Sequence, residues 1–329
     1  MITEPTVFIL GAGASKPYGY PTGAELRRQI CRDPVGKLSF QKKVNDSLLI
    51  DSEKESLVDQ WKKLAEVFFK SDTHSIDLFL NRNPDFSNIG KITIVHRILE
   101  AEKQSKFHED IQSEYQEQNW YSDLFDRMTN ELIKPDDYRK FGENAISFIT
   151  FNYDRSLEQF LYESLQNSFY ESAQPQPGYM KRIDQLKRIQ IFHVYGCIGR
   201  LPWQGGDHEY KFDCVLKNIL EMKDNIKLIH ERLTSEIEEM KAIISKAKKI
   251  FFLGFGYAKE NMEVLNIPRI LRGQKIYGTA LGLLEERQLL DIYDSFGKNS
   301  LYSNVYPEEA ETTVNIKDLD CRSLLKKYL

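Results

Sequence analysis

The chain has 329 residues, of which 41% are hydrophobic and 29% are charged, and this ordinary globular composition argues against a disordered or fibrous protein. The formal net charge of −4 gives no general attraction for nucleic acid or for an anionic membrane. Because the sequence shows neither a signal peptide nor an apolar run of about 18 residues, we expect a cytoplasmic protein with no membrane or direct nucleic-acid partner.

The first predicted elements are a strand at residues 6–10, a glycine loop and a helix at residues 22–31. Residues 45–138 then show helical periodicity and no convincing strand, so we predict an all-helical module inserted into a sheet domain made of residues 1–44 and 139–329. The helical patterns within this module are residues 57–69, 76–80, 92–99 and 121–132.

Strand patterns return after the module, and helical stretches separate most of them. The predicted strands are residues 145–150, 189–195, 249–253 and 275–279. Residues 217–248 have apolar side chains at helical spacing among many charges, which predicts one long or two shorter surface helices. Strands that alternate with helices predict an α/β fold: a Rossmann-like parallel sheet with helices on both faces.

The glycine loop follows the first strand directly, and it contains Gly11, Ala12, Gly13 and Ser15. Glycines allow the backbone to approach a phosphate, and the amino terminus of a following helix favours negative charge, although a plain turn explains a lone Gly-x-Gly equally well. Lys16 occupies the position at which a dehydrogenase fingerprint has its third glycine, so the loop does not predict a hydride-transferring enzyme. The Gly-Lys-Ser/Thr ending of a phosphate-binding loop is also missing, so the loop does not predict hydrolysis of a nucleoside triphosphate.

Polar side chains follow the later strands as well. Asn152 and Asp154 come at the end of the strand at 145–150. The exposed amide of Asn152 can orient a ribose or a water, or it can shape a turn. Asp154 can bind a hydroxyl, or it can cap the helix that follows. His193 lies near the end of the next predicted strand, at 189–195, and it is either a general base or a packed histidine. Glycines at 254 and 256, with Glu260, follow a further strand, and they either contact a ribose or form a plain turn.

Five short blocks, in this order, resemble the sirtuin-like family and in particular its bacterial anti-phage defence branch. They are residues 11–15 (Gly-Ala-Gly-Ala-Ser), 75–80 (Ser-Ile-Asp-Leu-Phe-Leu), 150–154 (Thr-Phe-Asn-Tyr-Asp), 194–199 (Val-Tyr-Gly-Cys-Ile-Gly) and 252–257 (Phe-Leu-Gly-Phe-Gly-Tyr). The blocks span most of the chain, and helical sequence lies between the first and the third.

The resemblance implies that NAD is bound as a substrate, that Asn152 lies beside the nicotinamide ribose and that a nearby histidine activates this ribose or a water. The NAD-binding residues that we assign are Gly11, Ala12, Gly13, Ser15, Asp77, Asp154, Tyr195, Gly196, Gly254, Gly256 and Glu260. Members of the defence branch cleave the nicotinamide bond to deplete the NAD of an infected cell. The resemblance therefore predicts an NAD glycohydrolase that forms a homo-oligomer and works beside a partner such as a DNA-translocating ATPase.

Metal binding is not expected, because the four cysteines, at positions 31, 197, 214 and 321, form no Cys-x-x-Cys pair. Deacylating sirtuins carry a four-cysteine zinc module, so protein deacylation is not expected either.

One block departs from the family, whose sequence usually reads Lys-Leu-His-Gly-Ser at the position of Gly196. Tyr195 then takes the place of the catalytic histidine, and His193 lies two residues earlier, on the same face of the expected strand. Three hypotheses follow: a glycohydrolase with Asn152 and His193 as catalytic residues, a catalytically weak NAD- or ADP-ribose-binding regulatory subunit, and an oligomerisation platform for the ATPase.

Overall fold

The computed structural model describes residues 1–106, 117–170, 175–231, 234–267, 269–271, 273–282, 286–297 and 312–329. These residues form one six-stranded sheet in which every neighbouring pair of strands is parallel, in the order β3-β2-β1-β4-β5-β6. The strands are β1 (Thr6–Leu10), β2 (Ile146–Thr150), β3 (Gln190–His193), β4 (Lys249–Leu253), β5 (Lys275–Thr279) and β6 (Thr313–Lys317). The predicted Rossmann-like α/β fold is confirmed.

The central strand β1 explains the shape of the sheet. All five of its residues are buried, because β2 and β4 pair with it on either side. Phe8 stacks between Phe148 and Phe251, with ring centroids 5.3 Å away on both sides. Each large apolar side chain buried in this way contributes about 1.5–3 kcal/mol to stability.

The chain reverses its direction of travel across the sheet at β1, and such a switch point opens a crevice at the carboxyl ends of the strands.

The observed strands differ from the predicted ones at the two edges of the sheet. Edge strand β3 ends at His193 rather than at Tyr195, because residues 194 and 195 form a turn, in which the Val194 N–H still donates to the carbonyl of Thr150 at 2.9 Å. Edge strand β6 was not predicted, since its sequence Thr-Val-Asn-Ile-Lys is short and polar, and only Ile316 is fully buried. Edge strands are paired on one side only, so they tolerate polar residues that weaken the sequence signal.

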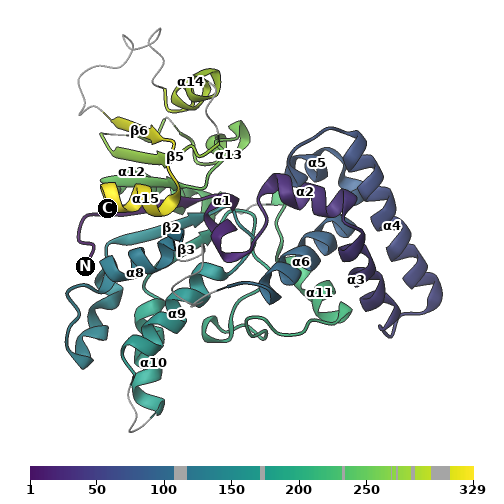
Figure 1. Cartoon of the computed structure of the whole chain (residues 1–329), viewed down its shortest axis with the longest axis horizontal. Coiled ribbons are helices and arrows are strands. Elements are labelled where there is room, and N and C mark those ends of the chain that lie inside the picture. Colours follow the sequence, from purple (N-terminus) through teal and green to yellow (C-terminus); the bar gives the residue numbers. More distant parts are fainter. Residues whose placement is uncertain are drawn as a thin grey trace.

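Helices flank the sheet, and three of them, α8 (Trp120–Thr129), α9 (Ser156–Ser168) and α15 (Cys321–Tyr328), pack next to one another (Figure 1). The predicted stretch 217–248 forms two helices, α11 (Leu216–Met222) and α12 (Thr234–Lys246). The remaining helices near the sheet are α1 (Ala12–Ser15), α10 (Pro175–Leu186), α13 (Lys259–Val264) and α14 (Glu286–Ser295). Short 3-10 helices cover Lys16–Tyr18, Pro84–Phe86, Pro135–Glu143, Pro202–Gln204, Lys223–Asn225 and Ile229–Glu231.

A second group of helices, which we call the helical lobe, lies to one side of the sheet (Figure 1). It consists of α2 (Gly23–Arg32), α3 (Pro34–Asn45), α4 (Asp51–Lys70), α5 (Ile76–Arg82), α6 (Ser87–Lys103) and α11. Its members therefore differ from the predicted insertion at 45–138. Helices α2 and α3 precede residue 45 and still pack on α4, whereas α8 lies inside the predicted insertion and packs on α9 and α15.

A buried ion pair fastens the helical lobe to the sheet. Arg155, just after β2, donates from Nε and from a terminal nitrogen to the two carboxylate oxygens of Glu102 in α6, at 2.9 and 2.8 Å. Both side chains are almost completely buried, and Arg155 also donates to the carbonyl groups of His208 and Glu209. This bidentate geometry fixes the lobe against the carboxyl end of β2.

The loops that follow β1 and β4 interlock. The Gly11 and Gly13 N–H groups donate to the carbonyls of Leu253 and Gly254, each at 3.0 Å, and the Gly254 N–H donates to Thr279 Oγ1 at 2.8 Å. Gly254 has a φ of +55°, and a Cβ at this position would lie 2.0 Å from the backbone nitrogen of Ala14. Close backbone contact between the two loops therefore requires glycine.

We expect Gly254→Ala to lower the free energy of unfolding by at least about 2 kcal/mol, because the new methyl group meets backbone atoms in a left-handed conformation. Gly23→Ala is the matched control, since a Cβ on Gly23 meets nothing within 4 Å, and its free energy of unfolding is expected to stay unchanged or to rise slightly. Urea denaturation measures both. Equal unfolding free energies of the two variants would show that the close contact between the two loops does not contribute to the stability of the fold.

Candidate functional site

A large cavity opens at the carboxyl ends of the strands, at the switch point of the sheet. Its volume is about 1020 Å³, at the upper end of the range of roughly 300–1,000 Å³ that is typical of ligand sites. The loops after β1, β2 and β4 line one side, and the segment between α4 and α5 of the helical lobe lines another. Sheet and lobe together therefore form the cavity.

Most of the residues that the sequence analysis assigned to a site meet in this cavity. Those that line it are Gly11, Ala12, Gly13, Asp77, Asn152, Asp154, Tyr195, Gly254, Gly256 and Glu260. Three assigned residues do not belong to its lining: Ser15, His193 and Gly196.

Asn152 is buried rather than exposed, with 7% of its surface accessible. Its Nδ2 group donates to the carbonyl of Gly11 at 3.0 Å and to Ser15 Oγ at 2.9 Å. Its Oδ1 atom is also buried and has no hydrogen-bond partner among the residues that the structure describes. Since the Gly11 carbonyl can only accept a hydrogen bond, the amide has one favourable orientation. Ser15 thus supports Asn152 from behind the cavity.

Asp154 lines the cavity and also stabilises the start of α9. Its Oδ1 atom accepts hydrogen bonds from the backbone N–H and from the hydroxyl of Ser156, the first residue of α9, whereas the N-cap position of this helix is Arg155 rather than Asp154. Burial raises the pKa of Asp154, although hydrogen bonds from Ser156 and Ser15 oppose this effect.

Two tyrosines connect the sheet with neighbouring helices across the cavity. The Tyr153 hydroxyl donates to Oδ1 of Asp77 in α5, and the Tyr195 hydroxyl donates to Asn261 in α13 at 2.7 Å. Burial and the nearby Asp77 carboxylate raise the pKa of Tyr153 well above its usual value, so this phenol stays protonated and donates. The block at 75–80 therefore reaches the site through Asp77.

The remaining assigned glycines have separate roles. Gly256 is exposed, and a Cβ there would meet nothing within 4 Å, so its backbone is open to a ligand. Gly196 has a φ of +70°, and its Cβ would lie 1.9 Å from the carbonyl oxygen of Asn225. Gly196 therefore shapes the turn after β3 and does not contact the cavity.

His193 does not lie where the sequence predicted a general base. Its Nδ1 interacts with the carbonyl of Asn152 at 3.0 Å and its Nε2 with Glu158 at 2.6 Å, so both ring nitrogens are occupied. Burial lowers its pKa, but the Cys197 sulfur, the Glu158 carboxylate and the two hydrogen bonds raise it more strongly, to about 10. A histidine that is protonated at neutral pH cannot accept a proton, so His193 is a positioning residue for Asn152.

Several residues of the cavity were not found from the sequence. His74, in the segment before α5, is exposed and is the one histidine among the described residues that line the cavity. Asp320 and Cys321, at the start of α15, reach the cavity from the end of the chain because β6 brings them there. The sequence block 75–80 pointed to the vicinity of His74, but no signal marked residues 320 and 321.

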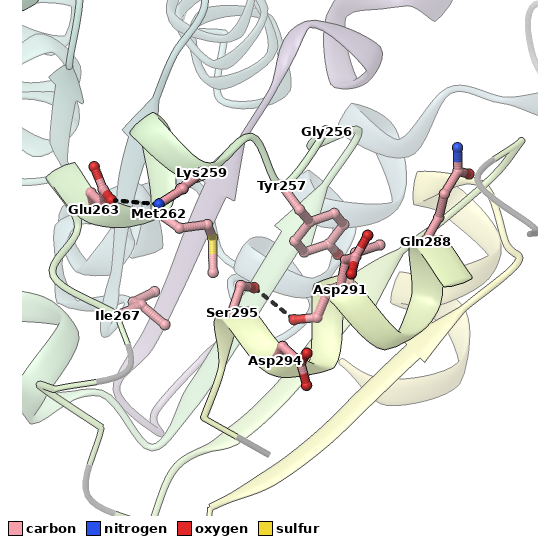
Figure 2. Close-up of a pocket in the computed structure, with 11 residues that line it drawn as sticks. Gly256, Tyr257, Lys259, Met262, Glu263, Ile267, Gln288, Asp291, Asp294 and Ser295 are labelled. Carbon is pink, nitrogen blue, oxygen red and sulfur yellow. Dashed lines mark hydrogen bonds and ion pairs between the residues drawn. The ribbon is translucent and has the colours of Figure 1, made fainter. Parts of the chain in front are cut away.

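A second cavity of about 590 Å³ lies on the other side of the turn at residues 254–257, between α13 and α14 (Figure 2). Tyr257, Met262 and Ile267 form an apolar wall, and the Lys259 ammonium group lies 3.9 Å from Glu263. Of the assigned site residues only Gly256 borders it.

Within the described ranges, no three His, Cys, Asp or Glu side chains cluster in a way that would hold a metal ion. Among the helices of these ranges, none combines the length and the apolar composition that a membrane span requires.

No family model matches the chain, and neither does any curated protein. Fold and cavity define a Rossmann-like α/β protein with a large cavity at the switch point of its sheet. The sirtuin-like resemblance stays a prediction that depends on the five sequence blocks.

The pKa of His193 predicts a pH-dependent stability. Because the folded pKa of about 10 lies above the unfolded value of about 6.5, protonated His193 stabilises the fold fully below pH 6.5, and this contribution is lost as pH rises toward 10. The difference in unfolding free energy between the wild type and His193→Gln should shrink by up to about 1.4 kcal/mol per pH unit above pH 6.5.

Urea denaturation at pH 6, 7.5 and 9 measures this difference. His230→Gln is the control, because His230 is an exposed histidine outside the cavity, and its effect should stay small at each pH. A His193→Gln effect that does not change with pH would contradict the assigned protonation state.

Proposed function

We propose that the chain binds NAD in the large cavity and hydrolyses the bond between nicotinamide and ribose, giving nicotinamide and ADP-ribose. The observation that carries this proposal is the unpartnered, buried Oδ1 atom of Asn152 in the lining of a cavity large enough for a dinucleotide. A buried acceptor without a donor costs about 1–3 kcal/mol, so a ligand that supplies a donor gains this energy on binding.

A ribose hydroxyl or a water molecule is a donor of the required kind. The amide is oriented by Gly11 and Ser15, which take both of the hydrogen bonds that Nδ2 donates and leave Oδ1 as the atom to accept such a hydrogen bond. The cavity lining also contains two basic side chains, Lys16 and Arg82, which suit a pyrophosphate. Open space next to Gly256 allows a close approach of the ligand to the backbone.

The reaction needs one proton acceptor. The oxygen of a water molecule forms a bond with C1′ of the ribose, the electron pair of the glycosidic bond leaves with the ring nitrogen as neutral nicotinamide, and the water loses one proton. We assign this proton to His74, because His74 lines the cavity and is exposed, whereas His193 lies outside it and is already protonated.

The biological role follows from the resemblance to the sirtuin-like defence branch. Hydrolysis of NAD in an infected cell would deplete its NAD pool and stop phage replication. The homo-oligomer and the ATPase partner are part of the same proposal.

A second candidate function is a non-catalytic module that binds NAD or ADP-ribose and regulates a complex. It is favoured by Tyr195, which takes the place of the family histidine and whose hydroxyl group donates a hydrogen bond to Asn261. Both functions require that the chain binds NAD, but only the first requires that it hydrolyses NAD.

We expect Asn152→Ala to reduce NAD turnover about 100-fold or more, because removing one preorganised polar group from a reacting site typically costs this much. The variant should also lose about 1–3 kcal/mol of stability, since Nδ2 makes two buried hydrogen bonds. Nicotinamide release, with calorimetric NAD binding and a thermal melt, measures the effects. Asn218→Ala, outside the cavity, is the control. A wild type that binds NAD without turnover supports the regulatory module, and one that binds no NAD contradicts both functions.

His74→Ala should retain NAD binding and lose roughly 100-fold or more of the turnover, because the proposed proton acceptor is removed. His230→Ala removes an exposed histidine outside the cavity, and it should behave like the wild type. Unchanged turnover of His74→Ala would exclude His74 as the proton acceptor.

A further inference from the structure

The segment between α4 and α5, residues 71–75, forms one wall of the large cavity and carries His74. It connects two helices of the helical lobe, so its course depends on how the ends of those helices are held. His74 itself is exposed. Since an exposed ring is held little by packing, the backbone on either side of His74 sets where its imidazole lies.

The backbone that follows His74 is fixed by the start of α5. Ser75 is the N-cap of this helix, and its side chain accepts a hydrogen bond from the Leu78 N–H at 3.3 Å. The Ser75 carbonyl accepts another from the Phe79 N–H at 3.0 Å. These bonds form an ordinary N-terminal cap, and they hold the segment on one side of His74 only.

Arg27 of α2 holds the backbone that precedes His74. Helix α2 packs on α4 in the helical lobe (Figure 1). The Arg27 guanidinium group donates from Nε to the Thr73 carbonyl at 2.8 Å and from Nη2 to the Phe69 carbonyl at 3.1 Å. Phe69 lies in the last turn of α4, where carbonyl groups lack a partner within the helix and a positive charge is favourable. Arg27 therefore joins the end of α4 to the residue directly before His74.

The turn that Arg27 holds has an uncommon backbone conformation. Asp72 has a φ of +53°, in the left-handed region that residues with a side chain adopt at a cost in free energy. Its carboxylate lies 3.9 Å from Arg27 Nη2, and the guanidinium group lies over the ring of the buried Phe68, 5.4 Å from the centroid. One side chain thus contacts the turn at three consecutive points and keeps it in a conformation that the backbone disfavours.

We propose that Arg27 is a positioning residue for the reaction: by holding the Thr73 carbonyl, it places His74 at the wall of the large cavity. Arg27 does not belong to the lining of the cavity, so it acts through His74 and not by contact with the ligand. This inference rests on the proposed function, which assigns the proton of the attacking water to His74. A displacement of about 1 Å in a reacting group can lower the rate of a catalysed step about 100-fold.

The first test is the turnover of Arg27→Ala in the full chain, measured as nicotinamide release from NAD. We expect kcat to fall about tenfold to 100-fold, because His74 loses its fixed position, and KM to stay within about threefold, because no contact with the ligand is removed. Arg28→Ala is the matched control, since Arg28 is the next residue of α2, is exposed and lies outside the cavity lining. It should keep the wild-type kcat.

The second test repeats the change in the His74→Ala background. If Arg27 acts by placing His74, its removal lowers turnover no more than about twofold once His74 is gone, because the two changes affect one interaction. A residue that merely stabilises the fold would lower turnover by the same factor in both backgrounds. An equal loss in both backgrounds therefore contradicts a role that acts through His74.

The third test requires no turnover. Amide hydrogen exchange of a peptide that covers residues 71–75 should become faster in Arg27→Ala and should not change in Arg28→Ala, because only Arg27 holds this turn. A thermal melt checks that each variant is folded. Should Arg27→Ala not fold, Arg27→Lys takes its place in all three tests, since lysine keeps the charge and the packed stem but lacks the two-pronged donor geometry.

The possible results separate the two proposals. A wild type that hydrolyses NAD, together with an Arg27→Ala variant that keeps the wild-type kcat or the wild-type exchange at residues 71–75, contradicts this inference and leaves the proposed function standing. A wild type that releases no nicotinamide overturns the proposed function, and this inference with it.

Discussion

The contact between the loops that follow β1 and β4 is the constraint on which the site depends. Backbone hydrogen bonds join Gly11 and Gly13 to the β4 end, and the left-handed Gly254 allows the two chains to touch without a side chain between them. Asn152 then closes the arrangement from the β2 side by donating to the Gly11 carbonyl. Three strand ends are thereby held at fixed distances, and a polar amide is preorganised at the point where they meet.

The helical lobe turns this strand-end crevice into a cavity. The ion pair between Glu102 and Arg155 anchors α6 beside β2, and Asp77 of α5 meets Tyr153 across the opening. The lobe therefore supplies both a wall and an acidic group, so removing it would leave the glycine loops exposed and the site incomplete. The helices between β1 and β2 therefore take a direct part in forming the cavity.

Burial decides the roles of the two histidines. His193 is enclosed between Glu158 and the Asn152 carbonyl, which raise its pKa and engage both of its ring nitrogens in hydrogen bonds outside the cavity. His74 lies on the wall of the cavity, in contact with solvent. A histidine at a strand end thus supports the site through the backbone of Asn152, and a histidine in a loop of the lobe is the accessible one.

The sequence by itself determined the parallel sheet, because buried β-branched and aromatic runs such as Thr6–Leu10 are a local property of the chain. It also located most of the cavity, since the glycines and Asn152 directly follow such runs and the carboxyl ends of parallel strands share one edge. Only the tertiary structure decided which side chains far apart in the sequence meet at the cavity and which do not. The His193 side chain packs between Glu158 and the Asn152 carbonyl, outside the cavity, and the edge strand β6 brings Asp320 into it from the end of the chain. Side-chain direction after a strand end and long-range pairing at a sheet edge depend on packing partners that no local pattern records.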